Sequence, residues 1–135
     1  MSGDTREQVP AATAGDATAG PDASADRALA ALTEELAACL ESLGIALERT
    51  RDLRRQRGDG WTWLEAVEAE EPPLVVERIT QALGTLNTAG SRWRREEAAA
   101  LHAEGMSING IAALFGVTRQ RASVLVRDAA ASDRG

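Results

Sequence analysis

A glycine followed by an apolar residue, Gly116-Val117, divides the C-terminal part of the chain into two short segments whose apolar residues recur every three or four positions. Hydroxyl residues that favour helix N-caps precede both segments, Ser107 the first and Thr118 the second. Glycine is suited to the left-handed backbone of a sharp turn. The sequence therefore predicts two short helices joined by that turn, from Ile108 to Phe115 and from Arg119 to about Ala129.

A further helix is predicted before this pair, from about Ser91 to Glu104. Gly90 would end the helix that precedes it, Ser91 would cap it, and Gly105 would stop it. Two short helices that cross closely need a small residue at their contact, which is the place of Ala112. The core would be completed by Ile111, Phe115, Val117 and Leu125. Residues 91–130 are thus expected to form one domain of three helices.

The stretch SINGIAALFGVTRQRASVLVR, residues 107–127, resembles the helix-turn-helix of bacterial regulators and is similar to the versions in sigma-factor region 4 and in resolvases. The resemblance rests on Ala112 four residues before Gly116, on Val117 after it, and on Leu125. Ala122 departs from the pattern, because such motifs usually carry Val or Ile there. The resemblance implies a sequence-specific DNA-binding transcriptional regulator whose helix 118–129 reads the major groove.

Polar and basic side chains cluster on and around this helix. Arginine can bind guanine and glutamine can bind adenine through two hydrogen bonds each. This chemistry assigns base contacts to Arg119, Gln120 and Ser123, and base or phosphate contacts to Arg121 and Arg127. Phosphate contacts are expected from two helix starts and one basic cluster, namely Ser107, Thr118, Arg92, Arg94 and Arg95. The alternative is that these arginines only keep a helical face in water.

The charge distribution agrees with a DNA-binding C-terminal part. Residues 1–90 carry 8 Arg and 16 acidic residues, whereas residues 91–135 carry 7 Arg and 5 acidic residues. The overall net charge of −6 therefore comes from the region outside the proposed site. This acidic excess also favours an alternative function, a protein-interaction module that binds RNA polymerase, a sigma factor or another regulator through a similar fold.

Residues 26–57 have an apolar stripe at heptad a and d positions, formed by Leu29, Leu32, Leu36, Cys39, Leu43, Ala46, Thr50 and Leu53. This stripe predicts a long helix, which either pairs with a second copy in a homodimer or packs against the rest of the chain. Residues 1–25 are small and polar and are expected to be a disordered tail. Residues 26–90 would form a helical dimerisation or scaffold region.

The middle of the chain has a pattern similar to that of the C-terminal part. Aligning Gly58 with Gly105 matches Trp61 to Ile108, and residues 53–79 then read as a degenerate second helix-turn-helix. Its acidic residues would be repelled by phosphates, so it would serve as a scaffold or a protein-binding surface. Chance similarity between two amphipathic helix pairs explains the match equally well.

Composition favours an all-α fold: a long N-terminal helix, a short helical middle and the C-terminal three-helix domain. Trp61, Trp63 and Trp93 are expected to be core anchors, and Cys39 is expected in the core. We expect neither enzymatic activity, nor a cofactor, nor a metal, because the chain has no recognisable catalytic, phosphate-binding or metal-ligand pattern. No apolar run spans a bilayer and no secretory signal is recognisable, which predicts a cytoplasmic, nucleoid-associated protein.

Overall fold

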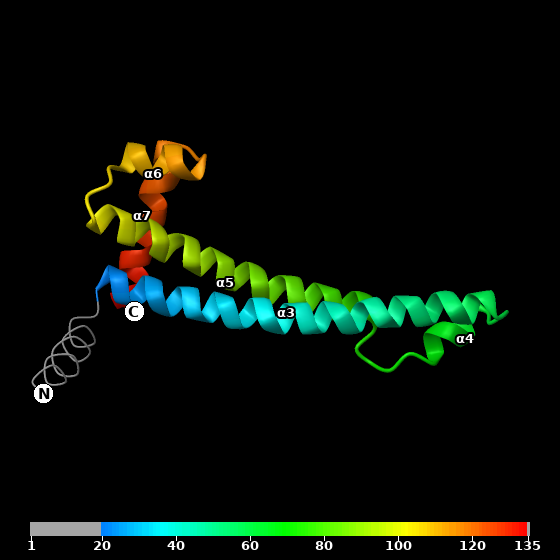
Figure 1. The fold of residues 1–135 in the computed structure, drawn as a ribbon. Coiled ribbons are helices and arrows are strands. Elements are labelled where there is room, and N and C mark those ends of the chain that lie inside the picture. The colour runs from blue at the N-terminus through cyan, green and yellow to red at the C-terminus, as the bar shows by residue number, and fades with distance from the viewer. Residues whose placement is uncertain (1–19, 135) are drawn as a thin grey trace, which may run out of the picture. The chain divides into compact units, whose positions relative to one another are not determined.

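The structure is a computed structural model that describes residues 20–134, with side chains placed up to residue 131. The chain is helical in this range and has no strand there, so the predicted all-α class is confirmed. Figure 1 shows its helices, which are α3 (Pro21–Gly58), α4 (Trp63–Glu68), α5 (Val75–Ala103), α6 (Ile108–Phe115) and α7 (Arg119–Arg134). None of them is both long enough and apolar enough to cross a membrane.

The chain divides into two compact units. The first unit combines the residues up to Ala31 with Gly90–Gly135, and the second unit is Leu32–Ala89. Both long helices, α3 and α5, contribute residues to each unit. The first unit therefore contains all of the candidate DNA-binding residues, and the second contains α4.

The long helix α3 starts earlier than the sequence predicted. It begins at Pro21, so residues 21–25 are helical and do not belong to the predicted tail. Residues 1–19 of that tail lie outside the described residues. Pro21 suits a first helical position, and Asp22 lies in the first turn, where a negative charge opposes the positive end of the helix dipole. Ser24, Ala25 and Ala28 are buried, although none of them is a large apolar residue.

The helix α5 runs from Val75 to Ala103, so Gly90 does not end a helix and Ser91 is not an N-cap. Glycine in a helix interior costs only about 1 kcal/mol relative to alanine. Buried alanines on both sides of Gly90, among them Ala89 and Ala98, hold the helix in place. The first of the three predicted C-terminal helices is therefore the last part of α5.

The first unit has a core of aliphatic side chains. Its buried members come from α5, α6 and α7 and are Ala98, Ile111, Ala112, Ala122 and Leu125. Partly buried residues pack around them, including Leu101, Met106, Ile108, Phe115, Val117 and Val126. All five core positions proposed from the sequence, Ala112 included, thus belong to this cluster or pack against it.

The second unit buries small residues and exposes large ones. Cys39 is buried as predicted, and Ala46 and Ala82 are buried with it. The predicted anchors Trp61 and Trp63 are instead 38% and 62% exposed. Their helix α4 contributes only Ala66 to the interior, because a helix of two turns between a glycine turn and a proline pair has little surface with which to cover an indole.

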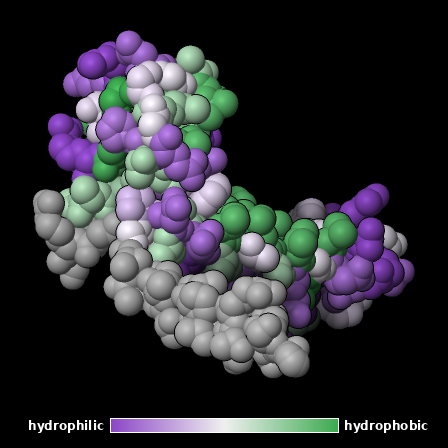
Figure 2. All heavy atoms as spheres, turned by 60° about the vertical axis from the view of Figure 1, so that its left-hand side comes forward, coloured by the Kyte–Doolittle hydropathy of each residue, from purple (hydrophilic) through white to green (hydrophobic). Residues whose placement is uncertain are grey.

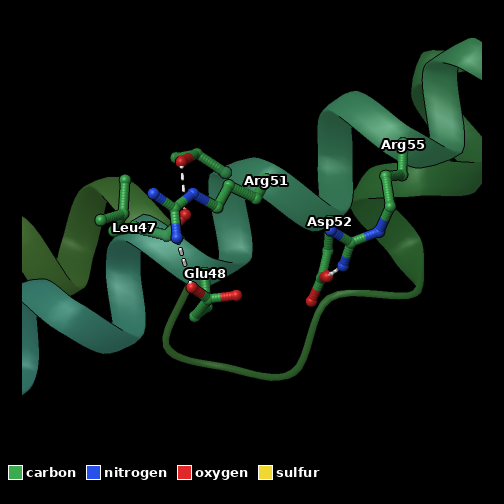
Figure 3. Close-up of polar contacts among 6 residues, drawn as sticks. Leu47, Glu48, Arg51, Asp52 and Arg55 are labelled. Carbon is green, nitrogen blue, oxygen red and sulfur yellow. Dashed lines mark hydrogen bonds and ion pairs between the residues drawn. The ribbon is translucent and has the colours of Figure 1, made fainter.

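Charged residues near the end of α3 pair with neighbours on the same helix. Arg51 reaches back one turn to Glu48 at 2.7 Å, and Arg55 reaches back to Asp52 (Figure 3). Exposed pairs of this kind contribute little to stability. They do, however, partly neutralise the basic end of α3, so these arginines do not form an unopposed positive surface.

Candidate nucleic-acid interface

Helix α6 is fixed at both ends by the residues that the sequence singled out. The hydroxyl of Ser107 accepts a hydrogen bond from the N–H of Gly110 at 2.9 Å, as an N-cap does. Gly116 ends the helix in the left-handed conformation, with φ 68° and ψ 36°. The next N–H, that of Val117, donates to the carbonyl of Ala112 at 3.0 Å. The predicted cap, helix and glycine turn are all confirmed.

Helix α7 begins at Arg119 as predicted and continues to Arg134, beyond the expected end near Ala129. The hydroxyl of Thr118 accepts a hydrogen bond from the N–H of Arg121 at 3.0 Å, which confirms the predicted cap. Ala122, Leu125 and Ala129 are almost fully buried and lie three or four residues apart, so they define one inward face of α7. Ala122 is 0% exposed, so a small residue fills the position at which similar motifs carry a larger one.

The other face of α7 carries the predicted base-reading residues. At 100° per residue, Gln120, Ser123 and Arg127 lie roughly opposite the inward face, with Arg119 and Arg121 at its flanks. All of these side chains are exposed except that of Ser123, which is half-buried. The first two turns of α7 thus present a polar, mostly basic surface to solvent.

The electrostatics of the first turn of α7 are unusual for a helix start. The turn contains Arg119 and Arg121 and no acidic residue. Positive side chains at a helix N-terminus lie beside the positive end of the dipole and are locally unfavourable. The free backbone N–H groups of the same turn add to the positive potential. This arrangement attracts an anion, and a residue pattern that opposes local stability is typical of functional sites.

The predicted phosphate contacts on α5 are in a different situation. The guanidinium of Arg94 lies over the ring of Phe115, 4.1 Å from its centroid, so it forms a packing contact between α5 and α6. Arg92 and Arg95 are half-buried. The exposed cluster is therefore centred on the start of α7, whereas Arg94, although exposed, is engaged with Phe115.

Sequence reasoning missed two residues beside this surface. Asn109 is exposed in the first turn of α6, next to the cap residue Ser107. Val124 is half-buried and follows Ser123 on the outer side of α7. The signal for Asn109 was a polar residue in the first turn after a cap, whereas Val124 was indistinguishable from a core residue. His102, for which the sequence indicated no partner, has its Nδ1 3.0 Å from the carbonyl oxygen of Met106.

The connection before α4 has the same local backbone structure as the connection before α6. Trp61 N–H bonds the carbonyl of Gln56 at 3.0 Å, and Met106 N–H bonds that of Leu101 at 3.0 Å. Both connections contain a glycine with positive φ, 96° at Gly60 and 105° at Gly105. Each is followed by a hydroxyl N-cap, Thr62 or Ser107, that accepts from the N–H three residues later.

This correspondence corrects the alignment made from the sequence. Gly60, and not Gly58, is the equivalent of Gly105, so Trp63 matches Ile108 and Ala66 matches Ile111. The similarity stops at the end of the second helix. Helix α4 ends at Ala69 in a right-handed conformation, whereas α6 ends at the left-handed Gly116. The middle region therefore lacks the glycine turn that precedes α7.

No known protein family, curated protein or solved structure matches the chain. The candidate site is therefore defined by its geometry and chemistry alone.

Proposed function

We propose that the protein is a DNA-binding transcriptional regulator of the bacterial helix-turn-helix type, with α7 as the helix that enters the major groove. One observation carries the proposal: the capped first turn of α7 exposes Arg119, Gln120 and Arg121 while the opposite face of the same helix is buried. A helix that reads base edges needs this combination of a rigid support and a polar outer face.

The residues have distinct roles in this proposal. Arg119 and Gln120 make paired hydrogen bonds to guanine and adenine, and Ser123 makes a further base contact. Arg121, at the flank of the exposed face, and Arg127, near its centre, contact bases or phosphates. The N-terminus of α6, with Ser107 and its free amides, contacts the DNA backbone. Arg92 and Arg95 remain phosphate candidates of lower accessibility, because they are half-buried.

The active form in this proposal is a homodimer. Two copies would place two recognition helices on half-sites about 34 Å apart, or a multiple of that distance, on one side of the duplex. Each copy presents only one recognition helix to the DNA, so a dimer makes twice as many DNA contacts as a single copy. The target would then be a sequence with approximate two-fold symmetry.

The experiment is a fluorescence-anisotropy titration of random-sequence duplex DNA over a range of salt concentrations. The proposal predicts binding at low salt that weakens steeply as salt rises, with a slope of about −0.9 for each phosphate contacted. Arg121→Ala is expected to reduce that slope by about 1. Arg51→Ala is the matched control, because Arg51 pairs with Glu48 on α3 and should leave the slope unchanged.

A second function, docking to RNA polymerase, a sigma factor or another regulator, is favoured by the α4 region. Trp63 and Leu64 are 62% and 66% exposed, and acidic residues follow them on the same short segment. Exposed aromatic residues are enriched at protein interfaces. Absence of any DNA binding at low salt would reject the first function and leave this one.

A further inference from the structure

The Leu32–Ala89 unit has no large apolar side chain in its interior. Its buried residues are Cys39, Ala46, Ala66, Ala82 and Ala89, each at most 9% exposed. Helices that pack through alanines approach each other closely but bury little apolar surface. Each Å² of buried apolar surface stabilises the fold by roughly 25 cal/mol, so such packing contributes little stability. Four leucines of the two long helices in this unit, Leu36, Leu40, Leu47 and Leu83, are consequently left exposed.

On α3 these leucines form one face. Leu36, Leu40, Leu43 and Leu47 are spaced by four, three and four residues, so they lie on the same side of the helix. Leu36, Leu40 and Leu47 are 45%, 73% and 50% exposed, and Leu43 is half-buried. In this unit, α3 thus buries Cys39 and Ala46 and leaves Leu36, Leu40 and Leu47 exposed.

A shorter face of the same kind lies on α5. The face consists of Val76, Ile79, Leu83 and Leu86. Val76 and Leu83 are 69% and 51% exposed, and the other two residues are half-buried. Their spacing of three, four and three residues again places them on one side of the helix.

The two faces lie on the same side of the helix pair. Leu40 and Leu47 each directly follow a buried residue, Cys39 or Ala46, and Leu83 directly follows buried Ala82. Each leucine is therefore turned by about 100° from the buried line, in the same sense on both helices. Because α3 and α5 run in opposite directions in this unit (Figure 1), the same sense of rotation leads to the same side.

This joint surface, hereafter the leucine face (Leu36, Leu40, Leu43, Leu47, Val76, Ile79, Leu83 and Leu86), contains no charged residue. Residues 79–91 have no charged residue, and the charged residues that stand between members of the face in the sequence, Glu41, Glu77 and Arg78, lie off the face. Hydrophobic side chains are visible as a band on the helices in Figure 2. An uncharged surface of this kind is typical of the centre of an obligate interface.

We infer that the leucine face is covered by the leucine face of a second copy of this chain, so that two helix pairs form a four-helix bundle. Its five exposed members present on the order of 500 Å² of apolar surface. Each partner in a stable interface buries about 800 Å², of which roughly 60% is apolar. One leucine face against another therefore supplies the apolar area that a stable dimer needs.

The inference rests on the homodimer proposed above and assigns it a different surface from the one that the sequence indicated. The heptad stripe predicted either pairing of α3 with a second copy or packing of α3 against the rest of the chain, with Cys39 and Ala46 in the contact in both cases. Those two residues are buried within the monomer, at 6% and 3% exposure. The inferred dimer surface is built from both α3 and α5, and it shares Leu36 and Leu43 with the predicted stripe.

The test compares Leu47→Glu with Ile45→Glu by sedimentation equilibrium of the full chain. Ile45 and Leu47 are 43% and 50% exposed and flank Ala46 on opposite sides, so they form a matched pair on one helix. The wild-type protein and Ile45→Glu are expected to have twice the chain mass of 14.3 kDa. Leu47→Glu is expected to raise the dimer dissociation constant by roughly 100-fold or more.

A wild-type protein that stays monomeric over the whole concentration range, or equal dissociation of both variants, would overturn the inference. Should Leu47→Glu fail to fold, the wild-type melting temperature decides, because it rises with protein concentration only if folding is coupled to dimerisation. A concentration-independent melting temperature would then contradict the inference. A wild-type protein that dimerises but does not bind DNA would contradict the proposed DNA-binding function and would not contradict the inferred dimer surface.

Discussion

The hydroxyl oxygen of Thr118 lies 3.0 Å from the backbone nitrogen of Arg121 and accepts its hydrogen bond. This hydrogen bond holds the first turn of α7, which carries the exposed side chains of Arg119 and Gln120. It also satisfies one of the four N–H groups that a helix start leaves without a partner. The same cap therefore stabilises α7 and positions Arg119 and Gln120.

Replacing Thr118 with alanine should therefore lower the free energy of unfolding by about 1 kcal/mol. Thr118→Ser keeps the accepting oxygen and should lose much less. Chemical denaturation of the three proteins measures the difference. Equal stability of the alanine and serine variants would show that the hydroxyl does not act as a cap.

Arg94 is expected to support the fold and to make little contribution to DNA binding. Removing its guanidinium from the ring of Phe115 should cost about 0.5–1 kcal/mol of stability in Arg94→Ala. The slope of DNA affinity against salt should stay that of the wild type. A slope reduced by about 1 would instead mean that Arg94 contacts a phosphate.

Two glycines in the chain should respond in opposite ways to substitution by alanine. Gly116 has φ 68°, a conformation that costs a residue with a Cβ atom about 1–2 kcal/mol, so Gly116→Ala is expected to destabilise the protein. Gly84 lies inside α5 with open space around it, so Gly84→Ala should stabilise the protein by about 0.5–1 kcal/mol. Thermal unfolding measures both changes, and a stabilising Gly116→Ala would contradict the turn geometry.

The start of α4 should depend on pH through Glu65. Hydrogen bonds from the backbone N–H and then from the hydroxyl of Thr62 lower the pKa of this carboxyl group below its usual value. Because the folded state has the lower pKa, the stabilisation is present above the usual pKa and is lost as pH falls through the lowered one. An NMR titration should show the lowered pKa of Glu65 in the wild type and only a partial return toward the usual value in Thr62→Ala, because alanine removes the hydroxyl but keeps the backbone N–H that has the larger effect.

Much of the α6–α7 arrangement was predictable because its signals are local. Ser107, Gly116 and Thr118 act through hydrogen bonds and backbone angles within three or four residues of themselves, so their spacing is sufficient to place both helices. The exposure of Arg119 and Gln120 follows from the same spacing, since Ala122 and Leu125 fix the inward face.

The errors arose where a long helix and its packing outweigh a local signal. Gly90 looks like a helix end, but α5 is held on both sides by buried alanines. Of the stripe predicted from Leu29 to Leu53, α3 buries the small members Cys39 and Ala46 and leaves the leucines Leu29 and Leu36 exposed. Which side of an amphipathic helix faces its neighbour depends on residues far away in the sequence, and periodicity alone does not contain that information.

The measurement that tests the DNA-binding proposal most directly is selection of bound duplexes from a random library, followed by affinity measurements on the selected and on unrelated DNA. The proposal predicts an enriched motif with approximate two-fold symmetry. Arg119→Ala should then weaken binding to the selected sequence by about 1–3 kcal/mol and binding to unrelated DNA by much less. Failure to enrich any sequence, or equal weakening on both DNAs, would contradict base reading by α7.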